Sequence, residues 1–298
     1  MITISGLTKK FGDFVALDNI DLTIPEGSAF GVLGSNGAGK STLLRLMSGI
    51  YQQDKGKILI DGEEIFDNVK NKQKIFFIND ETIQFSQFTI KELKDFYKGF
   101  YPDFSEDIFK SLCAKIKIPD NKKLSQFSKG MKRQAIVIIG LSCQTKYLFL
   151  DEAFDGLDPT MRIIVKHMIV DAMLDRNMTV IISSHNLKEI NELCDSVALF
   201  HKGKIVVNRQ LDEVKGNIHK IQLVFESELY REDFADLDVL HFEKQGRIIH
   251  IISKGEPDKI KAQLDEKNPL VIEMIPLTLE EIFIYEMEGL GYDCTEIN

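Results

Sequence analysis

The segment Gly-Ser-Asn-Gly-Ala-Gly-Lys-Ser at residues 34–41 constrains the fold more than any other part of the sequence. It matches the pattern Gly-x4-Gly-Lys-Ser/Thr of phosphate-binding loops. An apolar run at residues 28–33 predicts a strand before the segment, and residues 40–47 predict a helix after it. In this context the glycines let successive N–H groups point at a phosphate, and the helix dipole adds to their attraction. We therefore expect nucleotide binding by Gly34, Ser35, Asn36, Gly37, Ala38, Gly39, Lys40, Ser41 and Thr42.

Two side chains of this segment carry specific expectations. Lys40 is expected to neutralise the β- and γ-phosphate oxygens, and the Ser41 hydroxyl is expected to bind Mg²⁺. The expected cofactors are therefore ATP and Mg²⁺. The alternative interpretation is a glycine-rich turn between a strand and a helix that binds nothing.

A second pattern is the apolar stretch at residues 147–150 followed by two carboxylates, Asp151 and Glu152. Ligands of parallel α/β sheets bind at the carboxyl ends of the strands. Asp151 is therefore expected to reach the metal, and Glu152 the attacking water. A strand followed by an acidic cap is the alternative.

The rest of the first 215 residues predicts an α/β fold. Buried-type strands alternate with helices after residue 147, which favours a mostly parallel sheet covered by helices. We expect a P-loop NTPase core with an antiparallel β subdomain near the start of the sequence. Residues 80–145 predict an inserted helical subdomain with three helical segments, at 90–100, 105–116 and 131–143.

After residue 215 the pattern restarts, and we expect a small α+β accessory domain over residues 216–298. Three short strands and two helices are predicted there. The second helix begins with the capping-box pair Thr278 and Glu281. Expected elements are strands near 221–225, 248–253 and 270–275 and helices near 258–264 and 279–288.

Composition excludes some classes of protein. The chain has 298 residues, and its 37 basic against 46 acidic side chains give a net charge of −9, which disfavours nucleic-acid binding. Its 4 cysteines have no paired spacing, so neither a disulfide framework nor a zinc site is expected, and a reducing cytoplasm fits best. No apolar run approaches the roughly 20 residues of a membrane helix. Work at a membrane would need a partner.

Residues 127–134, Phe-Ser-Lys-Gly-Met-Lys-Arg-Gln, lie between the glycine-rich segment and the acidic strand. With them the chain resembles the ATP-binding cassette (ABC) ATPases, whose signature segment begins a helix at this place. The resemblance implies that two copies enclose two ATP molecules, with each signature closing on the other copy's phosphate loop. Ser128 and Gly130 would then meet a γ-phosphate. An ordinary serine N-cap is the alternative.

The resemblance implies three further site residues. Asp158, in the segment 154–159, would link one site to the other at the subunit contact, and is otherwise part of a turn. His185 would contact the γ-phosphate and hold the attacking water, and is otherwise a structural histidine. Phe11 would stack on adenine, and is otherwise an aromatic residue packed at the edge of the core.

One family position departs from the usual pattern. Members of the family commonly place Gln in the loop that joins the core to the helical subdomain, where it contacts Mg²⁺. Here Asp80 aligns with that position, and Gln84 and Gln87 follow. A carboxylate would reach the metal through water, whereas Asp80 as a turn cap is the alternative.

The resemblance covers residues 1–215 as an ABC-type nucleotide-binding domain and implies an ATPase with Lys40, Glu152 and His185 as catalytic residues. It implies a subunit that pairs as a homodimer, or as a heterodimer with another ATP-binding subunit, and drives a separate transmembrane permease. Such a subunit is cytoplasmic and peripheral on the inner face of the cell membrane. The sequence Ser-Lys-Gly-Met is similar to that of single-cassette subunits that export drugs, bacteriocins or ions. A soluble ABC ATPase acting on nucleic acid or the ribosome is the alternative.

Overall fold

The computed structural model describes residues 1–79 and 85–289 and divides the chain into two compact units, Met1–Asn208 and Arg209–Asn298. The division lies a few residues before the boundary after residue 215 that the sequence suggested. Mixed α/β architecture is confirmed, with a parallel sheet and separate antiparallel sheets. Each unit has its own core.

The first unit begins with an antiparallel sheet in the strand order β2-β1-β4-β5. Alternating apolar residues such as Ile2 and Ile4 face inward, and their register pairs Ile2 with both Ile24 and Ile60. The first strand extends from Ile2 to Phe11. The bounds are β1 Ile2–Phe11, β2 Phe14–Ile24, β4 Lys55–Ile60 and β5 Glu63–Glu64.

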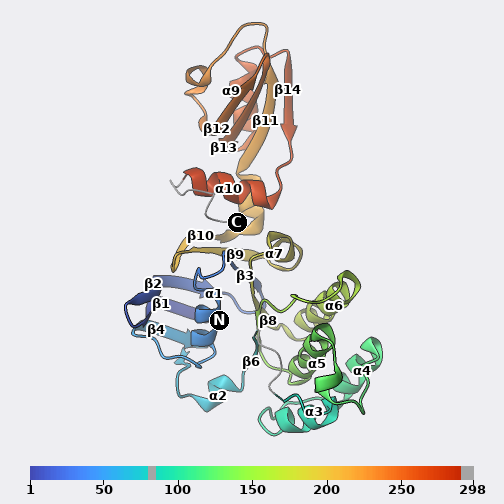
Figure 1. Cartoon of the computed structure of the whole chain (residues 1–298). Coiled ribbons are helices and arrows are strands. Elements are labelled where there is room, and N and C mark those ends of the chain that lie inside the picture. Colours follow the sequence, from blue (N-terminus) through green and yellow to red (C-terminus); the bar gives the residue numbers. More distant parts are fainter. Residues whose placement is uncertain (80–84, 290–298) are drawn as a thin grey trace. The chain divides into compact units, whose positions relative to one another are not determined.

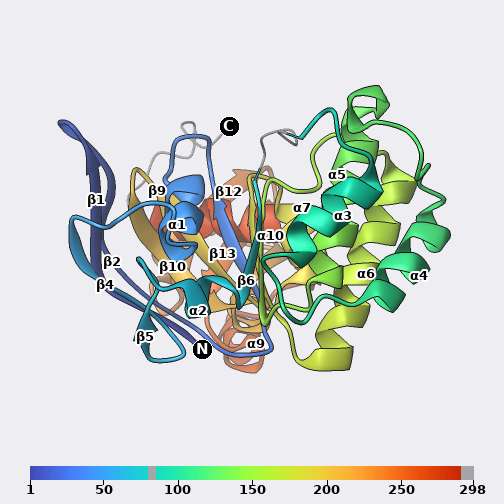
Figure 2. The same ribbon diagram turned by 90° about the horizontal axis from the view of Figure 1, so that it is seen from below.

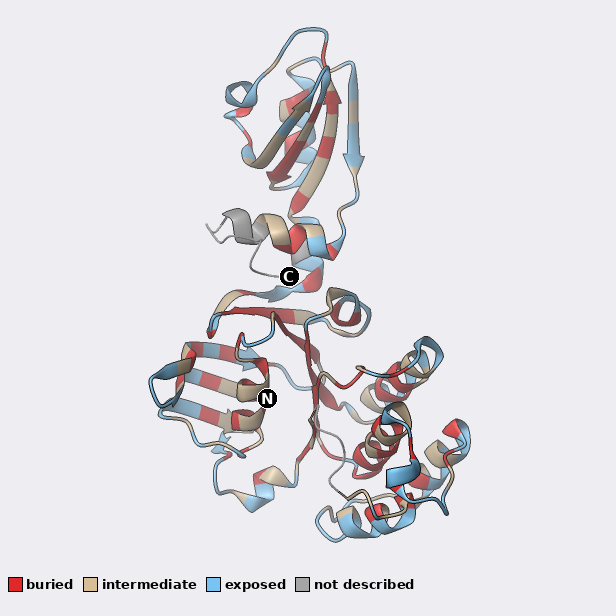
Figure 3. Cartoon of the chain, viewed as in Figure 1, coloured by how far each residue is buried: buried red, intermediate tan, exposed pale blue. Residues whose placement is uncertain are grey.

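A six-stranded sheet in the order β10-β9-β3-β8-β7-β6 forms the centre of this unit. Strands β9, β3, β8, β7 and β6 run parallel, so their carboxyl ends meet at one edge. Every residue of β3, β7 and β8 is buried, as expected for strands covered on both faces (Figure 3). The bounds are β3 Ala29–Gly34, β6 Ile75–Ile78, β7 Tyr147–Asp151, β8 Thr179–Ser184, β9 Ser196–His201 and β10 Lys204–Gln210.

Helices cover the central sheet on both sides. Helix α1 contacts β3, β7 and β8 and also β2, so it lies between the two sheets of the unit. Helices α3 to α6 lie on the other side of the central sheet, away from the antiparallel sheet, in both views (Figures 1 and 2). The bounds are α1 Lys40–Met47, α2 Val69–Lys72, α3 Ile90–Lys98, α4 Glu106–Ile116, α5 Lys129–Ser142, α6 Pro159–Arg176 and α7 Leu187–Leu193.

The second unit is an antiparallel sheet in the order β12-β13-β11-β14 with its own apolar cluster, which includes Ile221, Ile251 and Leu264. The capping box at Thr278 and Glu281 is confirmed, because each residue's side chain bonds the other's backbone N–H. No helix in the described ranges is long and apolar enough to cross a membrane. The bounds are α8 Leu211–Gly216, β11 Ile218–Val224, β12 Asp238–Gln245, β13 Ile248–Lys254, α9 Pro257–Asp265, β14 Val271–Ile275 and α10 Leu279–Gly289.

Candidate nucleotide-binding and hydrolysis site

The glycine-rich loop connects β3 to α1 in a conformation that requires glycine at two positions. Gly34 has φ 157°, and a Cβ there would lie 2.5 Å from the Phe200 carbonyl oxygen. Gly39 has φ 109°, and a Cβ there would lie 2.8 Å from the Ala16 carbonyl oxygen. Side chains are thus excluded where the loop is crowded. The loop ends directly at the N-terminus of α1, which suits it to bind an anion.

Lys40 is the first residue of α1 and is only 5% exposed. Its ammonium donates hydrogen bonds to the carbonyl oxygens of Gly34, at 2.7 Å, and Ser35, at 3.2 Å. The same nitrogen lies 3.4 Å from Glu152 Oε1. The Lys40 ammonium is therefore held inside the loop, beside Glu152, the carboxylate that the sequence predicts to reach the attacking water.

Asp151 ends β7 and is fully buried. Its Oδ1 accepts hydrogen bonds from Ser41 Oγ, at 3.0 Å, and from Ser183 Oγ, at 2.5 Å. Among the described residues its Oδ2 has no hydrogen-bond partner. A buried carboxylate oxygen left unbonded beside a serine hydroxyl fits Mg²⁺, which prefers oxygen ligands. Ser41 and Asp151 are thus the residues that could hold the metal.

Glu152 follows in a left-handed backbone conformation with φ 47°. Its N–H donates to the Ser183 carbonyl oxygen, at 3.2 Å, and its Oε2 lies 3.0 Å from His185 Nδ1. The Glu152 side chain is 14% exposed and that of His185 51%. A partly desolvated carboxylate therefore faces an accessible imidazole, the arrangement of a base with a polar neighbour.

The structure adds two residues that the sequence analysis did not assign. Ser183 bonds Asp151 because the parallel register of β7 and β8 places the two opposite each other. Asp155 contributes a carboxylate oxygen within 4.8 Å of ligand atoms of both Glu152 and His185. The serine run before His185 was a signal for Ser183, but Asp155 depends on the path of a turn. We call Lys40, Ser41, Asp151, Glu152 and His185 the hydrolytic group.

A second set of predicted residues, Ser128, Gly130 and Asp158, forms the signature group. Ser128 Oγ accepts the Met131 N–H, at 3.2 Å, and so caps α5. Asp158 Oδ1 accepts the Thr160 and Met161 N–H groups, at 3.1 and 3.0 Å, and so caps α6. Both side chains are exposed. Capping accounts for these contacts, and the contact with a partner's nucleotide stays a prediction.

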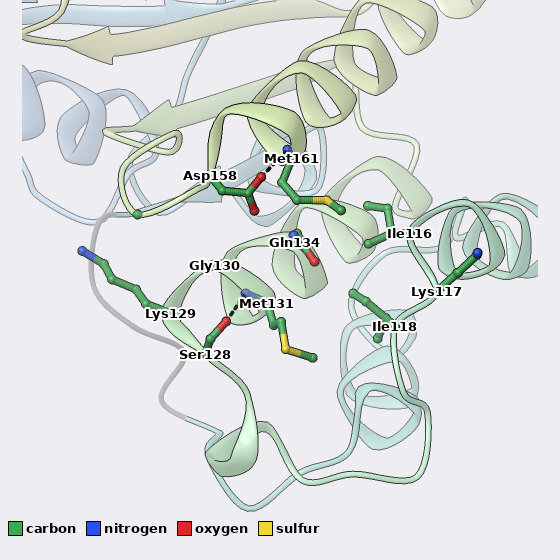
Figure 4. Close-up of a pocket in the computed structure, with 11 residues that line it drawn as sticks. Ile116, Lys117, Ile118, Ser128, Lys129, Gly130, Met131, Gln134, Asp158 and Met161 are labelled. Carbon is green, nitrogen blue, oxygen red and sulfur yellow. Dashed lines mark hydrogen bonds between the residues drawn. The ribbon is translucent and has the colours of Figure 1, made fainter.

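All three members of the signature group line one cavity of about 540 Å³ (Figure 4). Gly130 packs against the next loop so closely that a Cβ would lie 3.1 Å from the Gly156 carbonyl oxygen. The apolar side chains of Ile116 and Ile118 line the cavity wall on the side away from Lys129. The complete lining is Ile116, Lys117, Ile118, Ser128, Lys129, Gly130, Met131, Gln134, Gly156, Asp158 and Met161.

Phe11 ends β1 and is 46% exposed. Its ring and that of Tyr51 pack in a T-shaped pair, with 5.6 Å between ring centroids, and Lys9 Nζ lies 5.4 Å from the Phe11 centroid. An exposed, braced ring is able to stack on a base. Asp80 and Gln84 lie outside the described residues, while Gln87 accepts a hydrogen bond from Lys123 Nζ, at 3.3 Å.

Comparisons with known proteins agree with this geometry. The family model described as "ABC transporter" matches residues 17–155. The chain is 30% identical over 289 residues to the ABC transporter ATP-binding protein YtrB of Bacillus subtilis, covering 97% of this chain and 99% of the relative. It is also 30% identical to the lantibiotic transport ATP-binding protein SrtF of Streptococcus pyogenes, covering 76% of this chain and 99% of the relative.

Solved structures share the fold of most of this chain. The ATP-binding subunit of an ABC transporter superposes with a TM-score of 0.66 at 21% identity, over 72% of this chain and 92% of that one. An ATP-binding cassette in a dimeric post-hydrolysis state with ADP and Pi superposes with a TM-score of 0.63 at 19% identity. That match covers 71% of this chain and 99% of the other.

Proposed function

The chain belongs to the ATP-binding subunits of ABC transporters, and from this premise we propose that it works in pairs around two MgATP to drive a separate transmembrane permease. Members of this family bind and hydrolyse ATP, and this chain is an ATPase of that kind. The partner cassette is a second copy or another ATP-binding subunit. Export is the proposed direction, and the protein is proposed to lie in the cytoplasm against the inner face of the membrane.

The observation that carries the proposal is the meeting of Lys40, Glu152 and His185 at one sheet edge. Glu152 Oε2 is placed to accept a proton from an attacking water, and the His185 ring beside it to orient that water. Lys40 offsets negative charge on the phosphates in a site from which water is partly excluded. Mg²⁺, when held by Ser41 and Asp151, would neutralise the β- and γ-phosphate oxygens. Asp80 is proposed as its outer ligand.

Pairing is supported by the signature group. Ser128 and Asp158 face a cavity at the surface, and the hydrogen bonds that their side chains make within the described residues are capping contacts. A γ-phosphate presented by another cassette would supply an acceptor for the N–H groups at the start of α5. The two halves of each nucleotide site would then come from different subunits.

Export is proposed on two grounds. Residues 128–131 are similar in sequence to those of export subunits, and one relative is named a lantibiotic transport ATP-binding protein. The partner permease would supply the membrane-spanning segments. We propose no nucleic-acid partner, because the net charge of −9 provides no general attraction for a phosphate backbone.

The Glu152→Gln variant tests the cycle. It removes the proposed base but keeps the shape of the side chain, so the ATP-bound pair should accumulate. We expect hydrolysis to fall at least about 100-fold and light scattering to show an ATP-dependent doubling of mass. The control is Glu64→Gln, an exposed position on β5. Normal hydrolysis by Glu152→Gln would reject the assigned base, and failure to pair at saturating ATP would reject the two-cassette scheme.

A second experiment tests the partner. The chain is extracted from native membranes in mild detergent, and the proteins that co-purify are identified. We expect a multi-span membrane protein. Recovery with ribosomes or nucleic acid, and without a membrane protein, would instead support the soluble alternative.

A further inference from the structure

Helices α6 and α7 begin beside two residues of the proposed cycle. Asp158 caps α6, and His185 immediately precedes Asn186, which caps α7 by accepting the Lys188 N–H, at 2.9 Å. Asp158 is proposed to reach the partner's site, whereas His185 belongs to the site of its own chain. A contact that joins the starts of these helices would therefore join two different sites.

Such a contact exists and centres on Glu189, in the first turn of α7. Glu189 Oε2 accepts a hydrogen bond from Ser184 Oγ, at 2.8 Å, and Ser184 directly precedes His185. Glu189 Oε1 lies 3.4 Å from Arg162 Nη1, in the first turn of α6. The backbone N–H of Arg162 donates to the Asp158 carbonyl oxygen, at 2.9 Å, at the start of the same helix. A continuous series of contacts thus runs from Ser184 to Asp158.

The burial of Glu189 makes the contacts in this series costly to break. The Glu189 side chain is only 4% exposed, although it carries a charge. A buried carboxylate that loses its cation or its hydrogen-bond donor is left poorly solvated, which is costly. Ser184 and Arg162 are therefore hard to separate, and displacement of one favours displacement of the other.

We propose that Glu189 is a positioning residue that couples His185 to Asp158, so that the γ-phosphate state of one site is transmitted to the subunit contact. The inference rests on the proposed function, in which these two residues contact different nucleotides. Glu189 itself touches neither nucleotide. It acts through Ser184 on one side and through Arg162 on the other.

The same pair of helices contains a natural control. Lys166, one helical turn after Arg162, pairs with Glu192 at 2.5 Å. Glu192 is 43% exposed, so water can replace its partner. If Glu189 merely held the two helices together, its removal and the removal of Glu192 would have similar consequences for activity.

The test compares Glu189→Gln with Glu192→Gln in the full chain. Gln keeps an acceptor for Ser184 but loses the charge that holds Arg162, and it leaves no buried unpaired anion. ATP affinity, binding stoichiometry and kcat are measured, with kcat expressed per bound nucleotide so that misfolded protein does not count. We expect Glu189→Gln to lower kcat about 10-fold with ATP affinity changed less than about 2-fold, and Glu192→Gln to change neither by more than about 2-fold.

Three further measurements separate coupling from simple damage. In the Glu152→Gln background, Glu189→Gln should raise the ATP concentration needed for pairing about 5-fold, because Asp158 is less well placed. Arg162→Lys, which keeps the charge, should retain at least about half of the wild-type kcat. Combined with His185→Ala, Glu189→Gln should add less than about a 2-fold loss, since it acts through that histidine.

Equal behaviour of the two Gln variants would overturn the proposal, as would losses that multiply in the double variant. Failure of the proposed function is a different result. In that case Glu152→Gln alone would not pair with ATP, whatever residue occupies position 189. The kcat comparison and the double variant would still decide whether Glu189 acts through His185.

Discussion

The hydrolytic group and the signature group lie in the same unit but differ in how far one chain completes them. Lys40, Asp151 and Glu152 are largely buried and bond across two strands and a helix. Ser128 and Asp158 are exposed, and in the part of the chain that the structure describes their side chains bond to the helices that they cap. Under the proposed function, a single subunit therefore builds the phosphate and metal half of the site by folding. The other half would be completed by a partner.

The largest expected effect concerns the self-completed half. Lys40→Ala removes the cation from the loop, so ATP binding should weaken at least about 100-fold, or about 3 kcal/mol. Titration calorimetry with ATP measures this loss. Lys91→Ala, on the exposed face of α3, is the control and should bind normally. If Lys40→Ala bound ATP with unchanged affinity, the hydrolytic group would not be the phosphate-binding half of the site.

Ser128→Ala sharpens the comparison from the other half. The monomer should bind ATP as before, but steady-state hydrolysis should fall about 10-fold because the partner's γ-phosphate loses a donor. Ser128 also caps α5, and loss of the cap costs about 1 kcal/mol. Ser105→Ala is the matched control, since Ser105 caps α4 by accepting the Ile108 N–H, at 3.2 Å. Equal losses of hydrolysis in the two variants would assign Ser128 to capping alone.

Asp155→Asn tests the residue that the structure added to the first half. The Asp155 carboxylate lies near Glu152 and His185, so it would repel a negative phosphate bound there. A like charge several ångströms away in a partly shielded site is worth about 1 kcal/mol. Asp155→Asn should therefore lower KM for ATP roughly fivefold, with kcat changed less. Asp107→Asn, exposed on α4, is the control, and an unchanged KM would place Asp155 away from the phosphates.

The smallest effect on nucleotide binding and hydrolysis is expected away from both halves, at Asp61. Partial burial raises the pKa of this carboxyl, but hydrogen bonds from Tyr147, Lys146 and Lys74 outweigh burial and hold the pKa well below its usual value. The stabilisation is thus present above the ordinary value of 3.8 and is lost as pH falls toward the depressed folded pKa.

Asp61→Asn should therefore destabilise the protein by about 1–2 kcal/mol at pH 7. Its difference from wild type should shrink as pH falls below 3.8, which denaturant unfolding at several pH values would measure. Asp120→Asn is the control, because its exposed pair with Lys91 contributes little. A difference that grew in acid would contradict the assigned network, whereas unchanged ATP affinity would separate it from both halves of the site.

Sequence patterns predicted an element well when residues close together in the sequence determine its structure. The helix at Lys40–Met47 has the predicted bounds, because periodic apolar residues and the adjoining loop define them. Strand β12, at Asp238–Gln245, was not predicted. Most of its residues are only half-buried, so it lacks a continuous apolar run.

Site residues that belong to one short sequence motif could be predicted, whereas those that depend on contacts between distant segments could not. Lys40 and Ser41 follow from one motif, and Glu152 from the residue after a strand. Ser183 depends on the register between two strands that are distant in sequence. Asp155 depends on a turn whose path places its side chain back toward Glu152. The serine run before His185 draws attention to Ser183, but no local pattern predicts its pairing with Asp151 or the position of Asp155.

The hydrogen bonds of Lys40 have a consequence for how quickly nucleotide is captured. The ammonium already rests on the Gly34 and Ser35 carbonyl oxygens, so its side-chain entropy is lost when the protein folds and not when ligand arrives. An incoming triphosphate exchanges one set of oxygen acceptors for another around a cation that hardly moves. Association should therefore be limited by diffusion and charge attraction, with little delay for rearrangement of the loop.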